Sequence, residues 1–417
     1  MYSRGGGLDQ RFSTVGLWAG LALASACALL AGNAGASTPI QTTDAGIVGA
    51  SMQAAPAGVV NSWNDTEMRE ATPARTPSPP TTAFDVKPLG GGTASAAGVF
   101  LPQDTTAFPL RVHGRIFFRI GTVEYVCSGT VISSRGRNVV LTAGHCVYDF
   151  EQSEFASEMV FVPGYDGTAE QPAPFGTWAA AAVFTQTAFR DEGSLSHDIG
   201  AVVLSKPVEN RVGSRGVAFD LNPDGRSFTI FGYPVEPNSQ FTGESLVGCR
   251  SSTRGRDTVG SAPSPIAAGP CTMQDGSSGG GWVTDGRYVN SVVSYTYCDS
   301  TPTACGIIFG PYFGDQAKSL YTYPAVGGSV KPVIRITSGP PPKIRQSSAR
   351  FDFAGSGSTP LTYRCRLDSS PFRNCSSRVI AKRLSVGRHI LQVRAVDQTG
   401  NASRKTVERV FTVLRRR

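Results

Sequence analysis

The chain has 417 residues, of which 40% are hydrophobic and 17% charged, with 48 glycines, 28 prolines and a formal net charge of +8. A chain of this length exceeds the usual size of a single hydrophobic core, so two or more domains are expected. Low charge with abundant glycine and proline is typical of short strands joined by turns, and it argues against long exposed helices.

Residues 1–36 predict an export signal. Arg4 and Arg11 give a positive start, an apolar run covers 15–30, and the small residues at 34–36 form a cleavage site. A membrane anchor is one alternative, but the run is short and only mildly apolar for a span. Lipidation of Cys27 is another, although the apolar stretch continues past it. We expect a secreted, extracellular protein without a stable transmembrane anchor.

Cysteine usage agrees with export. The chain has nine cysteines, and removal of Cys27 with the signal leaves an even number for disulfides in an oxidising compartment. None of them stands in a paired CxxC arrangement, so no metal site is expected.

Four further segments follow along the chain. Residues 37–105 are rich in Ala, Gly, Thr and Pro, which favours either a low-complexity linker or a propeptide. Residues 106–325 contain short β-rich runs with Gly and Pro between them, as in a barrel or a sandwich. A Pro/Gly-rich linker at 326–342 precedes residues 343–417, where alternating apolar residues predict the half-buried strands of a small antiparallel sandwich.

Charge separates the C-terminal part from the rest. Residues 331–417 hold 19 Lys/Arg and 4 Asp/Glu, a net charge of +15, and the remainder carries −7. A basic module of this kind favours an anionic cell-wall or surface polymer as partner, and a solvated face that keeps the protein soluble is the alternative. No aromatic-interleaved motif is visible, so nucleic acid is not an expected partner.

The search for a general base is short because the chain has only four histidines. His145 follows a β-rich run, and Cys127 stands nineteen residues before Cys146. A Cys127–Cys146 disulfide would hold the loop that carries His145. A structural histidine beside a structural disulfide is the alternative interpretation of this motif alone.

A candidate nucleophile lies in the glycine-rich run 276–280. Glycines on both sides of Ser278 permit the unusual dihedrals and the close substrate approach that an exposed nucleophile requires. A Gly/Ser linker is the alternative, but Cys271 and Trp282 bound the run and an apolar strand follows it. We therefore interpret Ser278 as the nucleophile.

The third candidate is Asp198, just before the apolar run 201–204. A triad carboxylate must be buried and bonded to the imidazole, where it fixes the tautomer. His197 is the rival base, but it is adjacent to Asp198 and its ring is poorly placed for orientation by that carboxylate. We interpret His197 as a surface or packing residue.

The chain order His, Asp, Ser is that of the chymotrypsin-like fold. Three segments match the signatures of trypsin-like serine peptidases, namely 127–130, 142–146 and 276–280. Three others are similar to the bacterial branch that contains glutamyl endopeptidases, namely 115–118, 231–234 and 310–315. The resemblance covers about residues 108–323. It implies an all-β, chymotrypsin-like double β-barrel and a serine endopeptidase that hydrolyses protein or peptide substrates through an acyl-enzyme, without a metal or organic cofactor.

The resemblance also implies residue roles. Ser278 is the nucleophile, His145 the base and later the acid, and Asp198 the residue that orients it. The backbone N–H groups of Gly276 and Ser278 form the oxyanion hole. The resemblance implies substrate-binding positions at Thr272, Ser294 and Tyr295. It also implies two further disulfides, Cys249–Cys271 and Cys298–Cys305.

Three positions depart from the family pattern. Ser277 stands where animal digestive members carry an aspartate that pairs with a freed N-terminus, so that activation switch is absent. Val293 stands where glutamyl-specific members carry a histidine, and Thr272 where trypsin-type members carry a carboxylate. The preference for the residue before the cleaved bond stays open.

The C-terminal module resembles the small Ig-like repeats of secreted bacterial proteins, through residues 365–368 and 393–397. A Cys365–Cys375 disulfide would close the turn between two of its strands. An alternative function is a catalytically inactive or secondary protease scaffold that binds a cell surface or anionic polymer, although such a protein has no evident need for all three triad residues. We expect a monomer.

Overall fold

The computed structural model describes residues 37–40, 46–74, 79, 85–86, 98–235, 241–259, 262–273, 275–298, 305–323 and 325–415. The predicted export signal at 1–36 lies outside the described residues. Within the part that is described, no helix has both the length and the apolar character needed to cross a membrane.

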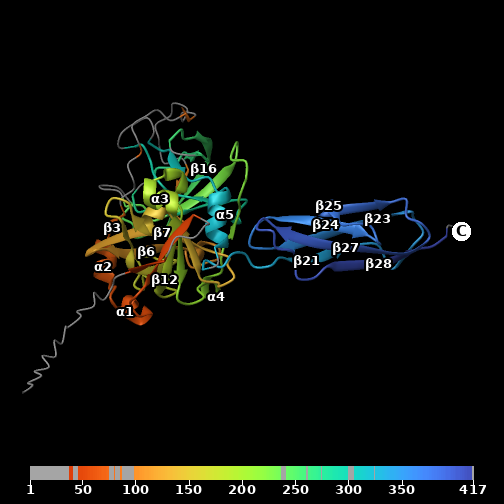
Figure 1. Ribbon diagram of the computed structural model, residues 1–417, viewed down its shortest axis with the longest axis horizontal. Helices are drawn as coiled ribbons and strands as arrows, with labels where there is room; N and C mark the ends of the chain where they lie inside the picture. The colour runs from red at the N-terminus through yellow and green to blue at the C-terminus, as the bar shows by residue number, and fades with distance from the viewer. Residues whose placement is uncertain are drawn as a thin grey trace, which may run out of the picture. The chain divides into compact units, whose positions relative to one another are not determined.

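Six strands close the first barrel. They are β6 (His113–Ile120), β7 (Val123–Ile132), β8 (Val139–Thr142), β11 (Ser157–Pro163), β12 (Trp178–Gln186) and β13 (Gly200–Leu204). Three of them, β6, β7 and β12, are labelled in Figure 1. The order is β12-β11-β6-β7-β8-β13, and β13 pairs back with β12. Its interior is filled by buried Ile, Val and Phe side chains such as Ile116, Phe118 and Val140. The β-branched and aromatic runs of the sequence thus supply a packed barrel core.

A second sheet is built from the following half of the family-like region. Its strands are β14 (Gly216–Val217), β15 (Ser227–Gly232), β16 (Val247–Arg256), β17 (Ile266–Gly269), β18 (Gly281–Thr284), β19 (Tyr288–Val292) and β20 (Ile308–Gly310). The order runs β14-β19-β18-β15-β16-β17-β20. Tyr295, just after β19, forms a β-bridge with Phe309 of β20, and this bridge closes the sheet as well.

Short helices connect the strands of this region. They are α3 (Thr187–Glu192), α4 (Glu209–Val212) and α5 (Asp315–Thr322), with single 3₁₀ turns η1 (Leu110–Val112), η2 (Gly144–Cys146) and η3 (Leu195–His197). A small hairpin pairs β9 (Tyr148–Asp149) with β10 (Glu154–Phe155). The turns η2 and η3 matter most, because His145 lies in η2 and Asp198 directly follows η3.

The segment expected as a linker or propeptide contains folded elements. They are β1 (Ser37–Ile40), β2 (Ile47–Met52), α1 (Pro56–Asn61), α2 (Asp65–Glu70), β3 (Thr72–Pro73), β4 (Asp85–Val86) and β5 (Val99–Phe100). Strand β2 pairs antiparallel with β12, and β5 pairs with β16. Both alternatives for residues 37–105, a low-complexity linker and a propeptide, stay predictions.

Burial explains why this N-terminal segment folds. The Trp63 side chain is 5% exposed, and its indole N–H donates to the Glu158 carbonyl at 2.7 Å. Its ring packs against Phe117, and the Arg119 guanidinium lies 4.7 Å from the ring centroid. A capping box between Asn64 and Glu67 begins α2, a signal readable from the sequence.

The C-terminal module consists of two sheets. One has the order β21-β23-β26, with β21 (Val333–Ser338), β23 (Ser348–Ser356) and β26 (Arg378–Lys382). The other has the order β22-β28-β27-β24-β25, with β22 (Lys343–Ile344), β24 (Leu361–Leu367), β25 (Arg373–Cys375), β27 (Gly387–Asp397) and β28 (Val407–Val413). Both contribute to one core, which includes Phe351, Val393 and Phe411. Strand β21 lies inside the stretch expected as a Pro/Gly-rich linker.

A prediction tests whether the N-terminal segment is an integral part of the fold. The change Trp63→Ala should lower the free energy of unfolding by about 3–5 kcal/mol, because it removes a large buried ring and leaves a cavity. Urea unfolding followed by tyrosine and tryptophan fluorescence measures this. The control Leu101→Ala, at a side chain that is 57% exposed, should change little. Equal stability of both variants would contradict the packing of this segment.

Candidate active site

The two barrels supply different parts of the predicted site. His145 lies in η2, directly after β8, and Asp198 lies between η3 and β13, so both belong to the first barrel. Ser278 lies in the loop between β17 and β18, and Ser294 follows β19, so both belong to the second. The site therefore forms at the junction of the two barrels.

His145 and Asp198 meet through two hydrogen bonds. The ring Nδ1 lies 2.9 Å from Asp198 Oδ2, and the His145 backbone N–H donates to Asp198 Oδ1 at 2.8 Å. Both residues are buried. Gly144 permits this approach, because a Cβ there would lie 2.9 Å from Asp198 Oδ1.

The Asp198 carboxylate stays ionised in this buried position. Burial alone would raise the pKa of Asp198, but His145 and the hydrogen bonds from His145 and Ser294 outweigh it and hold the pKa below its usual value. Ser294 Oγ donates to Asp198 Oδ2 at 2.5 Å. An ionised carboxylate only accepts hydrogen bonds, so Nδ1 of His145 carries the proton and Nε2 has a free lone pair. Nε2 has no hydrogen-bond partner among the described residues.

Ser278 lies in a turn of its loop and is 4% exposed. Its side chain makes no hydrogen bond to His145 Nε2 in this structure. Such bonds are often long without substrate and tighten when substrate binds. Two flanking glycines have left-handed backbone angles, with φ of +79° at Gly276 and +81° at Gly279. A Cβ at Gly279 would lie 2.0 Å from Thr142 Oγ1, so no larger residue fits there.

The orientation of the Gly276 N–H follows from the peptide unit it belongs to. The carbonyl of Asp275 accepts a hydrogen bond from the Val235 N–H at 2.7 Å. In a planar trans peptide the N–H points opposite to the C=O, so the Gly276 N–H points away from Val235.

The N–H of Ser278 is oriented in the same way. The Ser277 carbonyl accepts from the Gly280 N–H at 2.9 Å, which turns the Ser278 N–H in the opposite direction. Within the described residues neither Ser278 nor Gly276 donates its backbone N–H to the protein. Two preorganised free donors beside a serine are the requirement of an oxyanion hole.

Ser128 holds this loop, and the sequence reasoning gave it no role. Its Oγ donates to the Gly276 carbonyl at 2.8 Å and accepts from the Tyr233 N–H at 2.9 Å. Its backbone N–H donates to the Ser278 carbonyl at 2.7 Å. The residue is 1% exposed. Its place in the signature segment 127–130 is the sequence signal that points to it.

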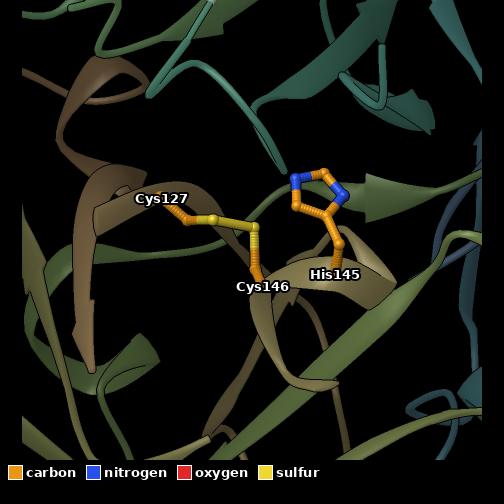
Figure 2. Close-up of side chains that lie close together, drawn as sticks. All are labelled: Cys127, His145 and Cys146. Carbon is orange, nitrogen blue, oxygen red and sulfur yellow. A yellow bond between two sulfur atoms is a disulfide. The ribbon is translucent and has the colours of Figure 1, made fainter. Parts of the chain in front are cut away.

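The four expected cysteine pairs are all present as disulfides: Cys127–Cys146, Cys249–Cys271, Cys298–Cys305 and Cys365–Cys375. Figure 2 shows the first beside the turn that carries His145. Cys127, His145 and Cys146 are close enough to suggest a metal site. The two sulfurs are bonded to each other, however, and neither is a thiolate that could bind zinc.

The remaining predicted residues lie on two neighbouring stretches. Thr272 is partly exposed, directly after Cys271. Tyr295 is buried, stacks on Phe309 with ring centroids 5.0 Å apart, and donates its hydroxyl to Asp257 Oδ2 at 2.6 Å. Burial, and then the neighbouring Asp257 carboxylate, raise the pKa of Tyr295 well above its ordinary value, so the hydroxyl remains a donor.

Asp257 is a buried carboxylate that the sequence reasoning missed. It also accepts from the Tyr297 hydroxyl at 2.8 Å and from the Val259 N–H at 3.1 Å. These bonds fix two tyrosines of the stretch that begins at Ser294. No spacing rule links Asp257 to those tyrosines, so only the fold reveals the contact.

His197 lies away from this arrangement. Its Nδ1 is 2.9 Å from Ser194 Oγ, and burial lowers the pKa of His197. It makes no hydrogen bond to the Asp198 carboxylate among the contacts of the described chain. The carboxylate therefore orients His145 and not its sequence neighbour.

Comparison with known proteins bears on the same region. The trypsin family model matches residues 103–309. A glutamyl endopeptidase of Bacillus licheniformis is 36% identical over 132 residues, which are 31% of this chain and 38% of that protein. An extracellular metalloprotease of Bacillus subtilis is 28% identical over 138 residues, 32% of this chain and 42% of that protein. The chain thus spans about two fifths of the length of these curated relatives.

Among solved structures, a thermostable serine protease, AL20, from an extremophilic microorganism is 33% identical, with a TM-score of 0.46. That similarity covers 52% of this chain and 97% of the other. The family match covers the strands of the two barrels described above as far as residue 309. Residues 103–309 are therefore similar to the trypsin family.

Proposed function

We propose that this protein is a secreted serine endopeptidase with His145, Asp198 and Ser278 as its catalytic triad. The observation that carries the proposal is the buried His145–Asp198 pair, which leaves Nε2 of the imidazole without a partner in the described chain. Ser278 and two free backbone N–H groups on the facing loop complete the arrangement. These are the parts that acyl transfer to water requires.

In the proposed reaction, Ser278 Oγ attacks the carbonyl carbon of a peptide bond and its proton moves to His145 Nε2. The carbonyl electron pair moves to the oxygen, which the N–H groups of Gly276 and Ser278 stabilise. When the C–N bond breaks, the imidazolium gives its proton to the leaving amine. Water then attacks the acyl-enzyme, again through His145, and releases the acid and free Ser278. Asp198 stays ionised throughout and stabilises the imidazolium.

The proposal extends to location and architecture. Disulfides persist in oxidising compartments, and the name of the Bacillus subtilis relative describes an extracellular protein, which together support secretion. We also propose that the two-sheet C-terminal module is Ig-like. Similarity to a glutamyl endopeptidase does not carry glutamate preference to this chain, because the Val293 side chain offers neither a charge nor a hydrogen-bond donor.

The first experiment is labelling of the protein with a fluorophosphonate probe. The parent should be labelled at Ser278, and Ser278→Ala should abolish the label, because only an activated serine reacts with this electrophile. Peptide mapping by mass spectrometry locates the adduct. Ser277→Ala, one residue away on the same loop, is the matched control and should keep most of the label. A folded parent that takes up no label would contradict the proposal.

A second prediction concerns the carboxylate. Asp198→Asn should lower kcat by about 10⁴-fold, because an amide cannot stabilise the imidazolium or hold the required tautomer. The lowered pKa of Asp198 also has a stability consequence with a definite sign. The wild type gains stability above the unfolded value of about 3.9, and loses it as the pH falls through the lower folded value.

Urea unfolding of wild type and Asp198→Asn at several pH values measures this difference. The advantage of the wild type should be full at pH 6 and shrink below pH 4. A constant difference over that range would argue against an ionised Asp198.

A third prediction concerns Ser128, proposed as a positioning residue. Ser128→Ala removes the hydrogen bond to the Gly276 carbonyl and leaves the Tyr233 N–H unpaired, so the oxyanion hole loses its fixed geometry. We expect kcat to fall about 10²-fold, by analogy with loss of one oxyanion donor, with KM nearly unchanged.

Steady-state kinetics on a peptide ester, with inhibition by a peptide boronate, measure this effect. The boronate should lose affinity in parallel with kcat, whereas a product peptide should not. A rise in KM as large as the fall in kcat would refute the positioning role. An unchanged kcat in a stable variant would refute it as well.

A further inference from the structure

We propose that the outer face of the five-stranded sheet in the C-terminal module binds a phosphodiester polymer that carries no bases. The surface is defined by Arg364, Arg366, Arg388 and Arg394, and it is called the arginine face below. This inference goes beyond proteolysis, because none of these residues belongs to the predicted catalytic machinery.

Strand register places the four arginines on one side of the sheet. Side chains alternate along a strand, and Cys365 of β24 and Val393 of β27 point into the core. Their neighbours Arg364, Arg366 and Arg394 therefore point outward. Arg364, Arg388 and Arg394 are exposed, and Arg366 is partly buried.

The carboxylate of Glu408 lies on the same face, where it accepts a hydrogen bond from Gln392. None of the four arginines forms a salt bridge within the described residues. On the other sheet, by contrast, Asp352 pairs with Arg350 at 3.2 Å and with Arg378 at 2.9 Å. The two faces of the same module thus differ in free positive charge.

Two of the arginines are direct cross-strand partners. Arg364 of β24 is in register with Arg394 of β27. Like charges in this position are about 4.5–5.5 Å apart at Cβ and destabilise a sheet. An anion bound between them would remove that repulsion. Anion binding therefore explains the presence of a pair that the stability of the sheet disfavours.

Phe372 preorganises the same region. The guanidinium carbons of Arg366 and Arg394 lie 4.6 Å and 4.5 Å from the centroid of its ring. The Arg366 side chain also donates to Gln392, and Arg394 donates to Thr406 at 2.8 Å. Held arginine side chains lose less entropy on binding, and their planar forks match phosphate oxygens in pairs.

The chemistry of the partner follows from charge and from this ring. Residues 331–417 carry a net charge of +15, which complements a polyanion. Recognition of single-stranded nucleic acid uses free aromatic faces for base stacking. The ring of Phe372 is already engaged by two arginines, so the arginine face suits a phosphate backbone without bases.

The test uses full-length protein with Ser278→Ala, which prevents self-cleavage, and a fluorescent poly(glycerol phosphate) probe in anisotropy titrations. The variant Arg364→Gln/Arg394→Gln should lose at least ten-fold in affinity. The slope of log affinity against log salt should fall by about 2, roughly one for each lost arginine contact.

The matched control is Arg335→Gln/Lys382→Gln, which removes the same charge from two exposed residues of the three-stranded sheet. It should lose no more than two- to three-fold. Equal losses in the two variants would overturn the proposal, since net charge alone would explain them. Tighter binding of oligothymidylate, or equal competition by polyglutamate, would overturn it as well.

Both double variants, made with Ser278 intact, should cleave a small peptide at the parent rate and unfold at or above the parent urea concentration. A protein that shows no protease activity but binds the polymer would refute the proposed function and leave this inference standing. An active protease that does not bind the polymer would refute this inference and leave the proposed function standing.

Discussion

The whole site depends on one buried negative charge. Asp198 is fully buried, and its two oxygens accept hydrogen bonds from the backbone and the ring of His145 and from Ser294. Burial of a carboxylate is costly unless such partners surround it. Because His145 comes from the first barrel and Ser294 from the second, the charge can be accommodated only when both barrels are folded and docked. The same bonds that stabilise the ion therefore orient the His145 ring.

A second layer of order lies in backbone carbonyls. Four consecutive carbonyls, from residues 275 to 278, accept hydrogen bonds from outside or across the loop. Fixing each C=O fixes the N–H on the same peptide unit, so the geometry of the loop does not depend on substrate. Ser128 supplies two of these bonds, one from its side chain and one from its backbone. The first barrel thus shapes a loop that the second barrel carries.

Some of this could be predicted from the sequence, because local chemistry determined it. The glycines around Ser278, the segment that ends in His145–Cys146 and the acidic residue before an apolar strand each require particular residue types. The contacts of Ser128 and Asp257 could not be predicted, because they join segments that are distant in the sequence. The strands and helices of the N-terminal segment were not predicted for another reason. Its Ala, Gly and Pro content suggests a linker, while a few large apolar residues such as Trp63 provide its packing.

That N-terminal segment changes what a proteolytic cut would accomplish. Five residues of β2 pair with β12, so the segment completes the edge of a sheet and covers Phe117 with Trp63. A cut on the C-terminal side of residue 74 would break the chain without undoing those contacts. The product would be a nicked protein, two fragments on a denaturing gel and a single particle in native buffer. Cleavage and release are thus separate events in this fold, and dissociation would have to expose an indole and a strand edge to water.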